Sequence, residues 1–216
     1  SIQELIGQAS FAKADIKDNS LIQYGIYNSH LSEKINKERY IENHMELALK
    51  NNEFFVVYQP KIKLSTGKII GAEALPDTFI PLFEKNGFVK KMDFYVFEQV
   101  FKFLQERLDK KETIVPISIN MSRNHSKPDR FFKDFMDLFH KYSIPQKYIE
   151  IEILERSVMD NNTLKTITDM LHKEGFSVAM DDFGYGESSL NMLHQIPVDV
   201  LKFDRSFLTS SYDKDG

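Results

Sequence analysis

The 216-residue sequence contains no cysteine and no tryptophan. Without cysteine, disulfide bonds, zinc-thiolate sites and a cysteine nucleophile are excluded. No stretch approaches the roughly 18 consecutive apolar residues that a membrane-spanning helix needs. A cytoplasmic domain is therefore the default interpretation, although other parts of a longer protein could anchor it to a membrane. Basic residues are not in excess, because 28 Lys and Arg stand against 32 Asp and Glu, and this balance argues against a dedicated nucleic-acid-binding protein.

The composition is that of an ordinary globular protein. Apolar residues make up 42% and charged residues 28% of the chain, which excludes intrinsic disorder and collagen. Eighteen phenylalanines predict a core rich in aromatic rings. The length fits one large domain, or one domain with a fragment of another.

The first 36 residues differ in pattern from the rest of the chain. Residues 2–13 have helical apolar spacing, and residues 21–27 are a candidate strand. One helix and one strand cannot bury a core by themselves. This segment therefore packs on the main domain or, the alternative we favour, is the end of an upstream domain. Residues 37–50 predict a linker helix leading into a main domain at 37–216.

The main domain alternates between strand and helix patterns. Residues 54–64 and 68–75 predict a β-hairpin. Strands separated by helices of ten or more residues then indicate a parallel sheet of an α/β protein. We expect further strands at 114–120, 148–154, 176–181 and 198–204, and helices at 78–85, 89–110, 129–142, 163–174 and 188–194.

Oxygen-bearing residues stand near the ends of five expected strands. They are Glu73, Asn120, Glu152, Asp181 with Asp182, and Asp204, which follows Lys202. In parallel α/β folds the carboxyl ends of the strands build the active site. Carboxylates and an amide oxygen meeting there suit a hard cation such as Mg²⁺ or Mn²⁺. We favour a metal site over structural ion pairs for the whole set, while for a single member both explanations stay open.

Two residues of this set have alternative interpretations. Lys202 is either a counter-ion for the neighbouring acids or a cation that orients a water or stabilises charge on a phosphate. Glu152 is expected to point into the pocket with the other acids. If it pointed outward, Glu150 would be the inward residue instead.

Several ordered motifs resemble one protein family over about residues 40–216. They are Tyr58-Gln59-Pro60, Gly71-Ala72-Glu73-Ala74-Leu75, Ser118-Ile119-Asn120-Met121-Ser122, Glu150-Ile151-Glu152-Ile153-Leu154-Glu155, Asp181-Asp182-Phe183-Gly184 and Leu201-Lys202-Phe203-Asp204. This series resembles EAL-domain phosphodiesterases, which hydrolyse the bacterial second messenger cyclic di-GMP. The resemblance implies a modified TIM (β/α)₈ barrel with one antiparallel strand, incomplete at the C-terminus here.

The resemblance also implies roles for individual residues. Two divalent ions, Mg²⁺ or Mn²⁺, would be held among Glu73, Asn120, Glu152, Asp181 and Asp182. A water between the metals would attack phosphorus in line and give linear pGpG. Lys202 matches the lysine that positions this water, and Glu155 matches a glutamate that supports the Asp-Asp loop. Gln59 matches a substrate contact, and we assign Asp204 to substrate binding as well.

The resemblance extends to partners and to the N-terminal segment. EAL domains commonly pair near the Asp-Asp loop, so we expect a homodimer. Ala9-Ser10-Phe11-Ala12-Lys13 and Tyr24-Gly25-Ile26-Tyr27 resemble the last helix and strand of a GGDEF-type diguanylate cyclase domain. Because no Gly-Gly-Asp-Glu-Phe motif is present, no cyclase activity follows.

The sequence departs from the family pattern in three places. The Arg-Trp pair that normally follows Leu75 is missing, so we expect Leu75 and Pro76 to flank a loop rather than to be bonded neighbours. Tyr185 and Glu187 stand at variable places of the loop after Asp182. The last two strands of the barrel are not in the sequence. These departures keep open a non-catalytic cyclic di-GMP receptor, or a dimerisation module, beside the phosphodiesterase.

Overall fold

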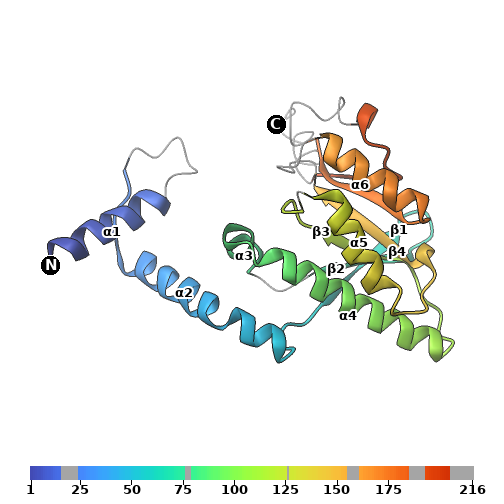
Figure 1. The fold of residues 1–216 in the computed structure, drawn as a ribbon, viewed down its shortest axis with the longest axis horizontal. Helices are drawn as coiled ribbons and strands as arrows, with labels where there is room; N and C mark the ends of the chain where they lie inside the picture. Colours follow the sequence, from blue (N-terminus) through green and yellow to red (C-terminus); the bar gives the residue numbers. More distant parts are fainter. Residues whose placement is uncertain (16–23, 76–78, 126, 155–160, 185–192, 205–216) are drawn as a thin grey trace. The chain divides into compact units, whose positions relative to one another are not determined.

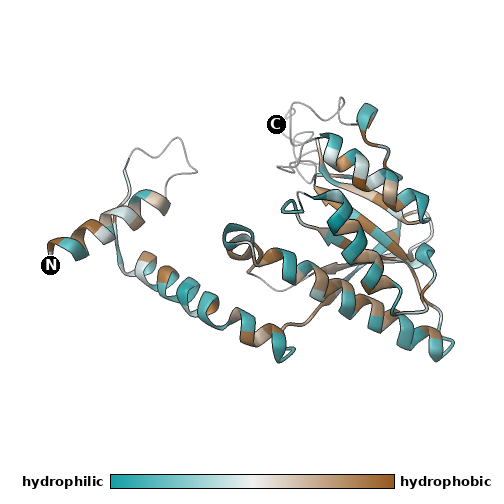
Figure 2. Cartoon of the chain, viewed as in Figure 1, coloured by the Kyte–Doolittle hydropathy of each residue, from teal (hydrophilic) through white to brown (hydrophobic). Residues whose placement is uncertain are grey.

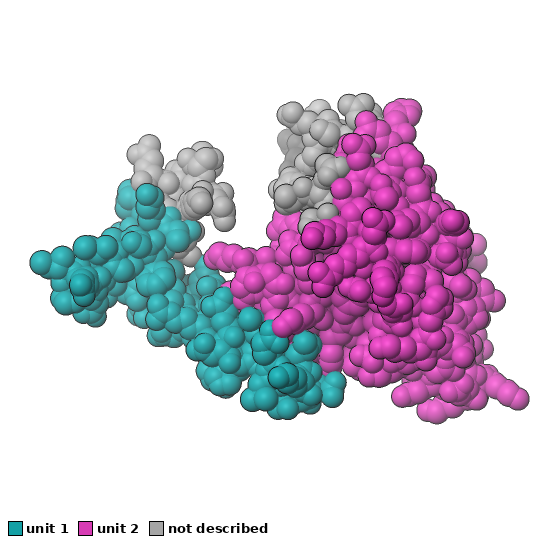
Figure 3. Space-filling view, in the orientation of Figure 1, with its two compact units in different colours: residues 1–53 teal, residues 54–216 magenta. Residues whose placement is uncertain are grey.

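The computed structural model describes residues 1–15, 24–75, 79–125, 127–154, 161–184 and 193–204. The chain divides into two compact units, residues 1–53 and 54–216 (Figure 3). Glu155, Pro76, Tyr185 and Glu187, on which several expectations rest, lie outside the described residues. Within the described residues, none of the helices has the length and apolar character that crossing a membrane requires.

The first unit consists of helices α1 (Ile2–Asp15) and α2 (Ser29–Lys50). Helix α2 begins at Ser29, eight residues before the expected linker helix, because Asn28 is its N-cap and accepts a hydrogen bond from the backbone N–H of Leu31 at 2.9 Å. Residues 24–28, the described part of the candidate strand and the residue after it, form no strand, so that expectation is wrong there. The domain boundary at residues 36–37 stays a prediction.

The second unit is built on a six-stranded curled sheet (Figure 1). The strands follow one another in sequence order: β1 (Val57–Lys63), β2 (Lys68–Leu75), β3 (Ile117–Met121), β4 (Ile149–Leu154), β5 (Ser177–Phe183) and β6 (Val200–Phe203). The β1–β2 pair is the expected antiparallel hairpin, and all other pairs are parallel. This topology confirms the α/β fold with one antiparallel strand.

Helices cover the outer side of this sheet. The described helices of this unit are α3 (Ile80–Asn86), α4 (Val89–Asp109), α5 (Pro128–Phe139), the short 3₁₀ helix η1 (Gln146–Tyr148) and α6 (Asn161–Lys173); α4 packs against β3 and α6 against β5. Helices α4, α5 and α6 lie side by side (Figure 1), and each carries a polar and an apolar side (Figure 2). The helix expected at 188–194 lies almost wholly outside the described residues.

The start of β3 shows how the strand register is set. The strand begins at Ile117, three residues later than expected, because Pro116 has no N–H to donate to a ladder. The Pro116 carbonyl instead accepts the N–H of Ala72 at 2.9 Å. A Cβ on Gly71 would lie 3.2 Å from this carbonyl oxygen, so a glycine allows the close approach. The contact fixes β2 beside β3 immediately before Glu73.

Phenylalanine rings form the core between the sheet and the helices. Phe135 on α5 is fully buried, and its ring lies 5.6 Å from Phe97, 5.9 Å from Phe101 and 5.3 Å from Phe176, all at steep interplanar angles. Edge-to-face packing of this kind adds to the free energy of apolar burial. The prediction of an aromatic core is confirmed for the described residues.

The Phe135→Ala substitution is therefore expected to lower the free energy of unfolding by about 3–5 kcal/mol, because it removes buried area and leaves a cavity between three rings. Urea denaturation followed by circular dichroism measures this change. Phe55→Ala is the matched control, since Phe55 is 61% exposed and its truncation should cost much less. Equal effects of the two substitutions would contradict this account of the core.

Candidate functional site

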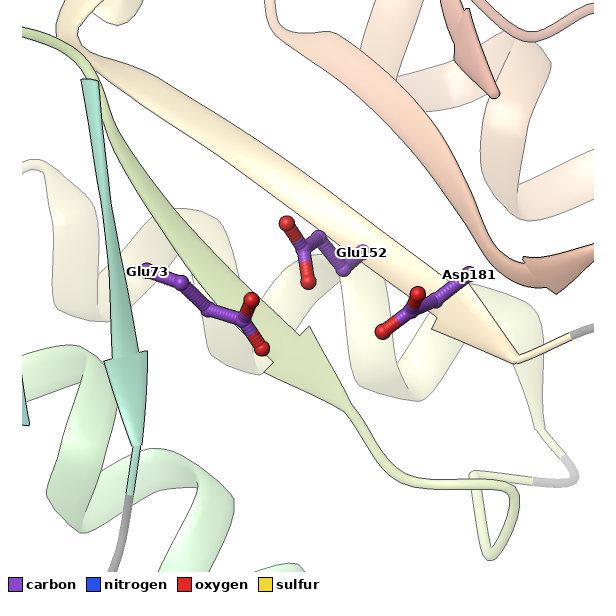
Figure 4. Close-up of side chains that lie close together, drawn as sticks. All are labelled: Glu73, Glu152 and Asp181. Atoms are coloured by element: carbon purple, nitrogen blue, oxygen red, sulfur yellow. The ribbon is translucent and has the colours of Figure 1, made fainter. Parts of the chain in front are cut away.

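Five neighbouring strands each contribute one polar side chain to a single cluster. Glu73 lies on β2, Asn120 on β3, Glu152 on β4, Asp181 on β5 and Lys202 on β6. One carboxylate oxygen from each of Glu73, Glu152 and Asp181 lies within 4.8 Å of the others (Figure 4). The sheet thus brings together five of the residues that the sequence singled out, near the C-terminal ends of its parallel strands.

The ammonium group of Lys202 holds the three carboxylates together. Its Nζ donates to Glu73 Oε2 at 2.8 Å, Glu152 Oε2 at 2.6 Å and Asp181 Oδ2 at 2.9 Å. Burial alone would lower the pKa of Lys202, but the bonds to Glu152, Glu73 and Asp181 outweigh burial and raise it above its ordinary value. Lys202 is thus a charged counter-ion in this structure, which matches the simpler of its two interpretations.

Glu73 is also held by Asn120, whose Nδ2 donates to Glu73 Oε1 at 3.0 Å. Desolvation would raise the pKa of Glu73, but its bonds to Lys202 and Asn120 prevail and lower it. Glu73 is therefore a carboxylate at neutral pH. The Asn120 amide keeps its oxygen as a further potential ligand beside this carboxylate.

Glu152 is the most enclosed member of the cluster, with a side chain that is 0% exposed. Its Oε2 accepts from Lys202, as above, and its Oε1 accepts from Lys61 Nζ at 2.8 Å. Glu152 therefore points inward, as expected. The expectation that Glu150 and Glu152 are alternatives for the inward position is wrong, because residues two apart on a strand share a face.

A second layer of polar residues lies beneath the cluster, and sequence reasoning missed most of it. Lys61 Nζ donates to Glu150 Oε1 at 2.8 Å and also contacts Ser118 Oγ. The Ser118 hydroxyl donates to the same Glu150 oxygen at 2.6 Å. Burial would lower the pKa of Lys61, but the bonds to Glu150 and Glu152 raise it instead. The sequence did contain a signal for this layer. Glu150 and Glu152 lie on one face of a buried strand, and two buried carboxylates need positively charged partners nearby.

A buried aspartate supports the turn that follows Asn120. Asp93 on α4 accepts the backbone N–H of Ser122 at 3.1 Å, and its Oδ2 lies 2.7 Å from His125 Nε2. Both contacts lie within five residues of Asn120 along the chain. They fix the end of β3 from the helical side, a role that the sequence pattern of α4 does not reveal.

Of the other residues with an expected role, Asp182, Gln59 and Asp204 are described. Asp182 is exposed at the end of β5 with φ of 55°, and its N–H donates to Asp181 Oδ1 at 2.9 Å. It does not belong to the three-carboxylate cluster. Gln59 is exposed on β1 directly opposite Glu73, and half-buried Asp204 follows β6.

The chemistry of the cluster fits a hard divalent cation. Carboxylate oxygens and an amide oxygen are the ligands that Mg²⁺ and Mn²⁺ prefer. Glu73, Glu152 and Asp181 carry three formal negative charges, and Lys202 supplies one positive charge among them. One divalent cation would neutralise the remaining formal surplus of two negative charges.

Comparison with known proteins assigns the chain to a family. The family described as EAL domain matches residues 42–216. The chain belongs to the EAL-domain family. This confirms the resemblance of the main domain, whereas the GGDEF-like origin of the N-terminal segment stays a prediction.

Two curated relatives show how this EAL domain compares in sequence. PdeB of Escherichia coli K12, described as a probable cyclic di-GMP phosphodiesterase, is 32% identical over 173 residues, which are 74% of this chain and 33% of PdeB. The signaling protein YkoW of Bacillus subtilis is 28% identical over 218 residues, covering 95% of this chain and 27% of YkoW. The chain therefore spans about a third or less of the length of these relatives.

A solved structure supports the fold of this EAL domain. The PaMucR phosphodiesterase, in its c-di-GMP complex, superposes with a TM-score of 0.72 at 26% identity. The match covers 82% of this chain and 77% of that chain. The curled sheet of the second unit is therefore part of an EAL-type, TIM-like barrel.

The cluster predicts an unusual response to loss of its lysine. Lys202→Met leaves three carboxylates around one point without their shared cation, and breaking a buried ion pair in this way costs up to about 3–5 kcal/mol. Adding Mn²⁺ should restore most of the lost melting temperature, because a divalent ion supplies the missing positive charge. Differential scanning calorimetry with and without Mn²⁺ measures both effects.

The control for this experiment is Lys165→Met, which removes an exposed lysine paired with Asp169 on the same helix. Its melting temperature should change little and should not depend on Mn²⁺ more than that of the wild type. If Lys202→Met were as stable as this control in the absence of metal, the bonds of Lys202 would not be structural.

Proposed function

We propose that this EAL domain hydrolyses cyclic di-GMP to linear pGpG in a metal-dependent reaction. The observation that carries the proposal is the convergence of Glu73, Glu152 and Asp181 within 4.8 Å at the C-terminal ends of the strands, in a chain of the EAL family. The c-di-GMP complex of the PaMucR phosphodiesterase and the description of PdeB support the choice of substrate.

The residues of the cluster would divide the work as follows. Glu73, Asn120, Glu152 and Asp181 would hold one divalent ion, and Asp182 beside Asp181 would contribute to a second. When bound, two such ions activate a water nucleophile and stabilise the leaving oxygen. The ammonium group of Lys202 would stabilise negative charge at the reacting phosphate. It already lies among the carboxylate oxygens of Glu73, Glu152 and Asp181.

Residues around the cluster would bind and support the substrate. Gln59 is exposed opposite Glu73, a position from which its amide could donate to a phosphate or a guanine. Asp204 follows β6 two residues after Lys202, and we propose a substrate contact there. For Glu155 we propose the supporting role that the family resemblance implies.

Hydrolysis is tested by incubating the protein with cyclic di-GMP and Mn²⁺ and measuring pGpG by chromatography. Glu152→Gln is expected to lower kcat by more than about 100-fold, since even the outer partners of metal ligands are worth 10–100-fold. Glu174→Gln, an exposed glutamate beyond the end of α6, is the control and should retain wild-type activity. Equal activity of both variants would contradict the assigned site.

A non-catalytic cyclic di-GMP receptor is the second candidate, and the altered sequence after Asp182, with Tyr185 and Glu187, favours it. The two functions differ in the same assay when binding is measured as well. Tight binding of cyclic di-GMP by the wild type, with no pGpG at micromolar protein, would establish the receptor and overturn the phosphodiesterase.

We also propose that the domain works as a homodimer in a longer cytoplasmic protein with a GGDEF-like domain upstream. The basis is the family resemblance and the short share of PdeB and YkoW that the chain covers. Analytical ultracentrifugation of the full-length protein at micromolar concentration should give twice the monomer mass. A monomeric mass there would overturn the dimer.

A further inference from the structure

Lys61 occupies an unusual place for a lysine on an edge strand of the described sheet. It lies on β1, whose other described side chains are mostly exposed, yet its Nζ reaches the inner face of β3 and β4. The three acceptors are Ser118 Oγ, Glu150 Oε1 and Glu152 Oε1. An ammonium group has three N–H donors, so this set accounts for all of them and fixes the orientation of the head group.

The two oxygens of Glu152 are held by two different lysines. Lys61 Nζ donates to Oε1 at 2.8 Å, and Lys202 Nζ donates to Oε2 at 2.6 Å. Oε2 is therefore the oxygen that faces Lys202 and the cluster of Glu73 and Asp181. The bond at Oε1 opposes rotation of the Glu152 carboxylate. Without Lys61, the buried Oε1 would lose its charged partner, and the carboxylate would be free to turn toward Lys202.

We propose that Lys61 is a positioning residue for metal binding: it holds the Glu152 carboxylate so that Oε2 faces Glu73 and Asp181. The proposal rests on the proposed function, because it assigns the metal site to these carboxylates. Lys61 itself acts from beneath and contacts neither Glu73 nor Asp181 in any bond that the described residues show. Its partners Ser118 and Glu150 anchor it in place.

A simpler role for Lys61 is to neutralise Glu150, whose half-buried charge would otherwise be bonded, within the described part of the chain, to Ser118 alone. The two roles make opposite predictions when Glu150 loses its charge. If Lys61 serves only Glu150, it becomes dispensable in Glu150→Gln. If it positions Glu152, removing it is as harmful in that background as in the wild type.

The test measures Mn²⁺ binding to the protein by isothermal titration calorimetry, without substrate. Lys61→Met is expected to weaken Mn²⁺ binding about 10–100-fold, the usual effect of losing a group that orients a metal ligand. Lys63→Met, an exposed lysine on the same strand, is the matched control and should bind as the wild type does. Equal affinities of the two variants would overturn the proposal.

The Lys61→Met/Glu150→Gln double variant separates the two roles and protects the test against misfolding. It leaves no unpaired Glu150 charge, so it should fold even if Lys61→Met alone does not. Relative to Glu150→Gln, the double variant should again bind Mn²⁺ about 10–100-fold more weakly. An affinity equal to that of Glu150→Gln would show that Lys61 only neutralises Glu150 and would overturn the proposal.

Activity provides a second readout where the wild type hydrolyses cyclic di-GMP. The Mn²⁺ concentration for half-maximal rate should rise by the same factor as the dissociation constant, with KM for cyclic di-GMP unchanged at saturating Mn²⁺. If the wild type binds Mn²⁺ but forms no pGpG, the proposed function fails while the calorimetric comparison still decides the role of Lys61. If the wild type binds no Mn²⁺, both fail.

Discussion

The buried carboxylate of Glu152 constrains both the curvature of the sheet and the construction of the site. A charge with no exposed surface is tolerated only when it is paired and hydrogen-bonded. Its two lysines come from β1 and β6, which are the first and last strands of the described sheet. A flat sheet would hold these edge strands several strand widths from each other. The sheet must curl for both lysines to reach one residue on β4, so the ion pairs of Glu152 depend on the curvature of the sheet.

The same bonds connect stability with function. Lys202 supplies the positive charge that Glu73, Glu152 and Asp181 need in order to lie together. The same carboxylates are the ones that a hard cation would use, so a bound cation would compete with the ammonium group for them. The family resemblance matches Lys202 to a lysine that positions the attacking water, a role in which its ammonium group would also have to release some of these carboxylates. A lysine suits both roles, as counter-ion of the carboxylates and as a cation in the reaction, because its ammonium group is at the end of a long flexible side chain.

Much of this arrangement could be predicted from the sequence, because strand alternation and strand ends leave a clear pattern. The hairpin, the parallel strands and the meeting of Glu73, Glu152 and Asp181 all follow from it. The role of Lys61 could not be predicted, since β1 is an edge strand and its contacts with Glu150 and Glu152 span 89 and 91 residues of chain. A period of two shows which residues share a face, but not how far a long side chain reaches across neighbouring strands.

The polar interior consists of two layers with different electrostatic properties. In the lower layer, Lys61 and Glu150 balance in charge, and the donors of Lys61 are all used by Ser118, Glu150 and Glu152. In the upper layer, three carboxylates share one lysine and keep a formal surplus of two negative charges. Of these two layers, the upper one has the charge surplus that a cation would neutralise, and it lies near the C-terminal ends of the parallel strands. Glu152 belongs to both layers, so the bond from Lys61 in the lower layer also restrains the carboxylate that Lys202 shares with Glu73 and Asp181 in the upper one.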